Sequence, residues 1–139
     1  MTNKSRRHAG VLLIVWPAVI FGGVSLLSLL ISPQSGYMEN PLRQNLWRAG
    51  HAHAGVLLIL SLVALRYVDE ANLSDRAKEL VRWLIPSAAI LLPVAFFLSV
   101  LSADATRPNA LIYLAYVGAV ALTAGLIILG VGLLRVKRG

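Results

Sequence analysis

Two histidines separated by one residue are the side chains in this sequence best suited to chemistry. His51 and His53 lie in the stretch Trp47–Gly55, where most other residues are alanine or glycine. Imidazole is the usual protein ligand of haem iron, and it also binds copper and zinc. The small neighbours leave room for a flat macrocycle or a close helix. His51, His53 and Gly55 are therefore the predicted cofactor-binding residues.

The spacing of the two histidines limits how they bind one ion. Residues two apart on a regular helix point about 200° away from each other, so His51 and His53 cannot both ligate one metal from such a helix. Either the helix begins after His51, or one histidine faces the neighbouring helices and the other faces elsewhere. On a regular helix His51 shares a face with Gly55.

A cofactor at this pair needs further ligands. The second axial ligand of a haem would come from His53 of the partner subunit in a symmetric dimer, or from side chains expected on the same side of the membrane: Tyr37, Met38, Tyr113 and Tyr116. A copper or zinc site would combine the two histidines with one of three other residues: Met38, Glu39 or Asp104. The predicted metal ligands are therefore His51, His53 and Met38.

Two other interpretations of the histidines need no cofactor. Both side chains can lie near the membrane interface and hydrogen-bond to loop carbonyls or to Asp104. They can also transfer protons or sense pH, because imidazole titrates near neutrality. The third histidine, His8, follows Arg6 and Arg7 and is predicted to be an interfacial residue.

The composition restricts the class of protein. The chain has 139 residues, of which 58% are hydrophobic and 14% charged, and its mean hydropathy is +0.74. A soluble domain carries about a quarter charged residues, so the low charge excludes a disordered protein. The absence of cysteine excludes disulfides, thiolate catalysis and covalent c-type haem attachment. Motifs of soluble enzymes are also absent, which leaves enzymatic activity undecided.

The apolar residues gather in four blocks, each near the length of about 20 residues that crosses a bilayer as a helix. The blocks cover about residues 11–31, 49–66, 83–103 and 109–134. Only Arg66, at the end of the second block, carries a formal charge. Because backbone polar groups in lipid must be satisfied within the segment, the blocks are helices. The sequence predicts an all-α polytopic membrane protein, one domain of four transmembrane helices in an antiparallel bundle.

Basic residues are distributed unevenly between the two sides of the predicted membrane. Ten lie in the N-terminal segment, the middle connection and the C-terminal segment: Lys4, Arg6, Arg7, Arg66, Arg76, Lys78, Arg82, Arg135, Lys137 and Arg138. Three lie on the other side: Arg43, Arg48 and Arg107. Cytoplasmic segments carry the excess of Lys and Arg, so both termini are predicted to be cytoplasmic in the cell inner (plasma) membrane. The bilayer, rather than nucleic acid, is the partner that this charge indicates.

The connections between the blocks differ in length. Residues 32–48 form a long polar outer loop, and residues 104–108 form a short turn. Ser74 followed by Asp75 predicts a helix cap and a short cytoplasmic extension of the third helix. Tyr37 and Trp47 are predicted to mark the outer membrane interface, as aromatic belts do.

Prolines and glycines interrupt the apolar blocks. Pro17, Pro86 and Pro93 lie inside predicted helices and should kink them. Three glycines lie seven residues apart in the fourth block: Gly118, Gly125 and Gly132. Such a row of small residues lets a second helix approach closely, either within the chain or in a homo-oligomer.

A seven-residue segment occurs twice. The sequence HAGVLLI begins at His8 and again at His53, and each copy opens a predicted span. Because the first two helices are antiparallel, the copies start at opposite membrane faces, about 30 Å apart. His8 and His53 therefore should not share a metal within one chain.

The entry to the second span resembles a known histidine motif. The pattern Trp47-Arg48-x-x-His51-x-His53 is similar to motifs of haem–copper oxidase catalytic subunits and the related nitric-oxide-response membrane proteins. The resemblance covers about ten residues, from Trp47 to Val56. It implies a haem or copper ligand at His51 or His53.

Three functional hypotheses follow. The first is a small membrane protein that binds haem or a transition metal, in electron transfer or metal handling. The second is a non-catalytic accessory or assembly subunit of a larger membrane complex, for example a respiratory complex. The third is an oligomeric transporter or channel, which the prolines suggest, although the spans lack the usual coupling carboxylate.

Overall fold

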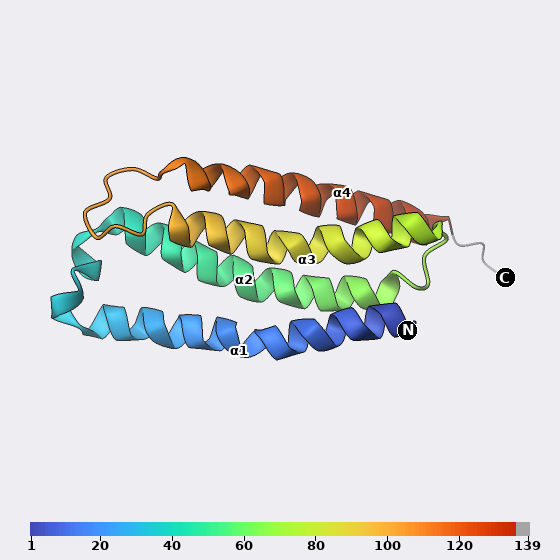
Figure 1. Ribbon diagram of the computed structural model, residues 1–139, viewed down its shortest axis with the longest axis horizontal. Coiled ribbons are helices and arrows are strands. Elements are labelled where there is room, and N and C mark those ends of the chain that lie inside the picture. Colours follow the sequence, from blue (N-terminus) through green and yellow to red (C-terminus); the bar gives the residue numbers. More distant parts are fainter. Residues whose placement is uncertain (136–139) are drawn as a thin grey trace.

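The computed structural model describes residues 1–135 and is all-α, as predicted (Figure 1). Its α-helices are α1 (Asn3–Ile31), α2 (Pro41–Tyr67), α3 (Asp75–Leu98) and α4 (Leu114–Leu134). Three short 3-10 turns accompany them: η1 (Pro33–Ser35), η2 (Tyr37–Glu39) and η3 (Ala110–Tyr113). In the described part of the chain, four helical segments are long and apolar enough to cross a membrane. Lys137 and Arg138, two of the cations used to predict orientation, lie outside the described residues.

The helices lie beside one another in chain order, and consecutive helices run antiparallel (Figure 1). The extensive contacts join α1 to α2, α2 to α3, and α3 to α4. The four helices therefore form an open row of antiparallel neighbours. The start of α1, the α2–α3 connection and the end of α4 lie at the same end of the row, which we call the basic end (Figure 1).

The second helix begins eight residues earlier than its apolar block. Pro41 occupies the first turn of α2, where proline is favoured because its missing N–H would have no helical partner. Asn40 caps this turn, since its side-chain oxygen accepts a hydrogen bond from Arg43 N at 3.1 Å. The predicted outer loop of residues 32–48 is therefore wrong in length, and the connection between α1 and α2 spans residues 32–40.

The third and fourth segments also differ from the predicted bounds. Helix α3 ends at Leu98 rather than near residue 103, and the fourth span opens with η3. Asn109 explains both ends, because its N–H donates to Ser99 O at 2.8 Å and its amide donates to Leu98 O at 3.0 Å. The predicted start of α3 is confirmed, because Ser74 caps the helix by accepting from Ala77 N.

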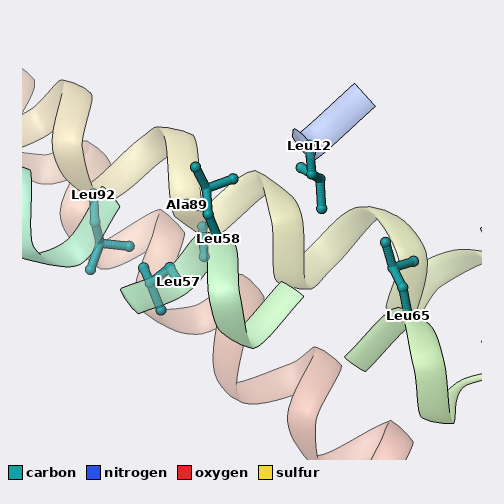
Figure 2. Close-up of a cluster of buried hydrophobic side chains, with 7 residues drawn as sticks. Leu12, Leu57, Leu58, Leu65, Ala89 and Leu92 are labelled. Carbon is teal, nitrogen blue, oxygen red and sulfur yellow. The ribbon is translucent and has the colours of Figure 1, made fainter. Parts of the chain in front are cut away.

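The core consists of two clusters of buried side chains between the helices. The first, shown in Figure 2, joins α1, α2 and α3 and contains Leu12, Leu57, Leu58, Leu65, Ala88, Ala89 and Leu92. The second joins α2, α3, α4 and the α2–α3 connection and contains Ala64, Val68, Ala71, Val81, Ile85 and Leu129. Helices α1 and α3 run through their prolines without interruption.

The glycine row of α4 lies against the rest of the chain. A Cβ atom on Gly125 would lie 2.7 Å from Ile85 Cγ1, and one on Gly118 would clash with Leu92. A Cβ atom on Gly132 would likewise clash with the side chain of Leu73. All three glycines are buried, so this row serves the close approach of α4 to α3 and the preceding connection within one chain.

Candidate functional site

The two candidate histidines lie on one uninterrupted helix and point to different neighbours. The ring of His51 lies against the paired glycines of α1, and a Cβ atom on Gly23 would be 3.0 Å from its Cε1 and Nε2 atoms. The ring of His53 instead meets Phe96 of α3 edge-on, with 5.3 Å between ring centroids. Since α2 begins at Pro41, the second of the two predicted alternatives holds, and one chain cannot place both rings on one metal.

The hydrogen bonding of His53 defines which ring nitrogen is available. Nδ1 lies 2.7 Å from the carbonyl oxygen of Ala49, one helical turn earlier. A carbonyl only accepts, so Nδ1 donates this hydrogen bond, and in the neutral ring Nε2 is the nitrogen that keeps its lone pair. The His53 side chain is exposed on the surface of the row. Metal-ligating histidines characteristically donate from the second ring nitrogen to a carbonyl or carboxylate, which fixes the tautomer and ring orientation.

His51 has a different environment. It is half-buried between α1 and α2, and within residues 1–135 neither of its nitrogens makes a hydrogen bond. Gly55 lies on the same side of α2, because a Cβ atom there would be 3.8 Å from Val19 Cγ1 of α1. His51 and Gly55 therefore share the face that packs on α1, and His53 does not.

The two histidines lie further from the start of their helix than predicted, because α2 begins before the apolar block at residue 49. His51 follows Pro41 by ten residues, which is about 15 Å along the helix at 1.5 Å per residue. Its contact with Gly22 and Gly23 places it beside the middle of α1. His8 lies fourteen residues before Gly22, which is about 21 Å along α1 from the glycines that contact His51.

The other predicted ligands lie apart from the histidines. Met38 is exposed on η2, and its carbonyl oxygen accepts a hydrogen bond from Gln44 Nε2 in the second turn of α2 at 3.0 Å. Tyr113 and Tyr116 stack on each other at the start of the fourth span, and Asp104 accepts a hydrogen bond from Ser102. Among residues 1–135, no group of three or more histidines and carboxylates is placed to hold a metal.

A buried arginine joins the start of α2 to the residues that follow α3. Arg43 donates to the carbonyls of Val100 and Leu101, both at 3.2 Å, and its guanidinium lies 4.3 Å from the ring centroid of Trp47. Trp47 donates to Phe97 O at 3.1 Å. This role of Arg43 is not apparent from the sequence, because its partners lie on a separate element.

The prediction that Tyr37 belongs to an aromatic belt at the membrane interface is wrong. Tyr37 is completely buried and stacks on Trp47 with 5.9 Å between centroids. Burial raises the pKa of its phenol, and the nearby charges of Arg48 and Arg43 offset part of that increase. The two rings therefore pack the end of the protein instead of lying together at the membrane surface.

A second polar network closes the basic end. Asp69, in the α2–α3 connection, accepts hydrogen bonds from Thr2 N (2.6 Å), Ser5 Oγ (3.0 Å) and Arg82 NH2 (2.7 Å). Arg82 also pairs with Glu79 at 3.3 Å, three residues earlier on α3. Partial burial raises the pKa of Asp69, but its hydrogen bonds outweigh this effect and lower the pKa to about 2.

Comparison with known proteins identifies no family for this chain. No protein-family model matches it, and neither a curated protein nor a solved structure matches it. The function must therefore be inferred from the residues described above. The resemblance of Trp47–Val56 to haem–copper motifs remains a prediction.

Proposed function

We propose that this chain is a multi-pass inner-membrane protein that binds haem, or a transition metal such as copper, through His53. Its role would be electron transfer or metal handling. The observation that supports this proposal is the hydrogen bond from His53 Nδ1 to Ala49 O at 2.7 Å, which leaves Nε2 as the ligating atom. The exposed position of the side chain makes that atom accessible from the surface of the row.

The surroundings of His53 suit a flat, apolar group. Ala52 is exposed beside it, and Val56 follows one turn later with 63% of its surface exposed. Phe96 supplies an aromatic edge on the α3 side. Small and apolar side chains of this kind allow a macrocycle to approach the helix closely.

His53 of the partner subunit is the candidate for the second ligand of a haem. Met38 lies on η2, and Tyr113 and Tyr116 lie at the start of the fourth span, whereas the exposed side chain of His53 can face a second copy of the chain. In a symmetric dimer with an isologous interface, the two His53 side chains would hold one haem between the subunits. Bound haem would supply one-electron redox chemistry, and the protein would set its orientation through Ala49 and His53.

An absorption spectrum with metal analysis tests this function. The protein is expressed with haem available, purified in mild detergent, and compared with His53→Ala and His51→Ala. We expect a Soret band that is lost in His53→Ala and kept in His51→Ala. A wild-type protein without a Soret band and without bound copper, iron or zinc would refute the proposal. An unchanged spectrum in His53→Ala would refute the ligand assignment.

An accessory subunit of a larger membrane complex is the second candidate function. One side of α1 packs on its neighbours, whereas Ile14 is 80% and Phe21 is 73% exposed. This apolar side can meet lipid or a helix of another protein. This candidate would be favoured if a defined partner co-purified with the wild-type chain in mild detergent but not with the Phe21→Ser variant. A chain that purifies alone as one stable species would count against it.

A further inference from the structure

An apolar groove opens between α1 and α3 at the basic end. It has a volume of about 480 Å³, within the range of roughly 300–1,000 Å³ typical of small-molecule sites. Its apolar wall is formed mainly by Val11, Leu12, Pro86 and Ile90, with the indole of Trp83 beside them. The groove lies far along α1 from the histidine site and forms a separate feature.

Charged side chains stand only at the end of the groove nearest the helix termini. Lys4 and Arg7 come from the first two turns of α1, and both are exposed. Glu79 of α3 faces them and pairs with Lys4 at 3.5 Å. The two cations outnumber the one carboxylate, so the mouth of the groove carries a net positive charge while its walls are apolar.

We propose that this groove binds one acyl chain of an anionic phospholipid, with the lipid phosphate at Lys4 and Arg7. The occupant needs an apolar tail beside a negative charge, and a phospholipid in the surrounding bilayer has both. Lys and Arg at the cytoplasmic edge of membrane helices attract anionic headgroups. Trp83 stands between charged mouth and apolar wall, the position that indoles prefer at a membrane interface.

His8 adds a polar group to the wall of the groove. Its ring packs edge-on against Trp83 with 5.0 Å between centroids, and Nδ1 lies 3.0 Å from Lys4 O. Its Nε2 atom is buried and has no hydrogen-bond partner within residues 1–135. In the neutral ring this nitrogen is therefore an unsatisfied acceptor in the lining of the groove.

Fluorescence quenching by brominated lipids tests this site. The protein is reconstituted in phosphatidylcholine vesicles, and lipids brominated on the acyl chain are added as phosphatidylglycerol or as phosphatidylcholine. The signal of Trp83 is obtained by subtracting that of the Trp83→Phe variant. Since each cation near the surface contributes about a fivefold preference for anionic lipid, we expect quenching at severalfold lower amounts of brominated phosphatidylglycerol.

Charge variants provide the controls. Arg7→Gln should lower the preference about fivefold, whereas Arg7→Lys should keep most of it. Arg76→Gln is the matched control, because Arg76 is an exposed cation at the same end but does not line the groove. Ser87→Leu should reduce quenching by both lipids by filling the groove. Equal quenching by the two lipids in the wild type, or an Arg76→Gln effect as large as that of Arg7→Gln, would overturn the proposal.

Discussion

Asp69 should be among the most important polar side chains for the stability of this chain. We predict that Asp69→Asn destabilises the fold by about 2–4 kcal/mol. Its carboxylate accepts from the start of α1 and from Arg82, whose side chain is 5% exposed, while that of Asp69 is 10% exposed. Replacing the acid leaves the Arg82 guanidinium buried with only Glu79 as a charged partner.

The lower bound of this prediction follows from the pKa of Asp69. A decrease from 3.8 to about 2 means that the folded state favours the charged carboxylate by about 2 kcal/mol, at about 1.4 kcal/mol per pKa unit. Asparagine resembles the protonated acid and loses at least this amount. The upper bound reflects the cost of about 3–5 kcal/mol for breaking a buried ion pair.

Equilibrium unfolding in mixed micelles, followed by far-ultraviolet circular dichroism, measures this effect. The matched control is Glu70→Gln, which removes an arginine-paired carboxylate from the same connection. Glu70 and its partner Arg66 are 49% and 59% exposed, so the control should cost less than about 1 kcal/mol. The double variant Asp69→Asn/Arg82→Met should recover part of the loss, because no guanidinium is then left unpaired. Equal costs for Asp69→Asn and Glu70→Gln would refute the reasoning.

Three further predictions concern the pKa of Asp69, the glycine row of α4 and the contacts of Arg43. Wild-type stability should fall by about 2 kcal/mol as the pH decreases from about 4 to 2, because the pKa of Asp69 is lower in the folded state than in the unfolded state. Unfolding measured as a function of pH should show this fall, and the Asp69→Asn variant should lack it. Gly125→Leu should destabilise by about 1–3 kcal/mol through its clash with α3, whereas Gly130→Ala, with nothing within 4 Å, should be neutral or stabilising in the same unfolding assay. Arg43→Met should lower the thermal midpoint and expose the residues after α3 to protease, because two carbonyls lose their donor.

The sequence predicted the number and type of the elements better than their ends. Apolar composition identifies the part of a helix that suits lipid, and α2 continues beyond that part because Asn40 and Pro41 start it earlier. The cap at Ser74 was predictable, since it depends on neighbouring residues alone. The end of α3 depends on Asn109, eleven residues beyond Leu98, and local patterns give no such signal.

The candidate site shows the same division between local and long-range information. Helical geometry alone predicted that His51 and His53 point apart. It did not show that His51 packs on Gly22 and Gly23, because that contact depends on how α1 and α2 align. The ion pair of Asp69 with Arg82 and the role of Arg43 likewise join residues from separate elements. Their charges were visible in the sequence, but their partners were not.

The open row gives the protein two unequal edges. Every helix of a closed bundle has neighbours on two sides, whereas α1 and α4 each rest mainly on one. At the α4 edge, buried glycines bring α4 into close contact with α3. At the α1 edge, only 11% of the apolar span is buried inside the protein, compared with 22% of the fourth span. Opening of the structure should therefore begin with α1, the segment with the fewest contacts to lose. In single-molecule pulling, α1 should detach first and leave α2, α3 and α4 as the mechanically resistant unit.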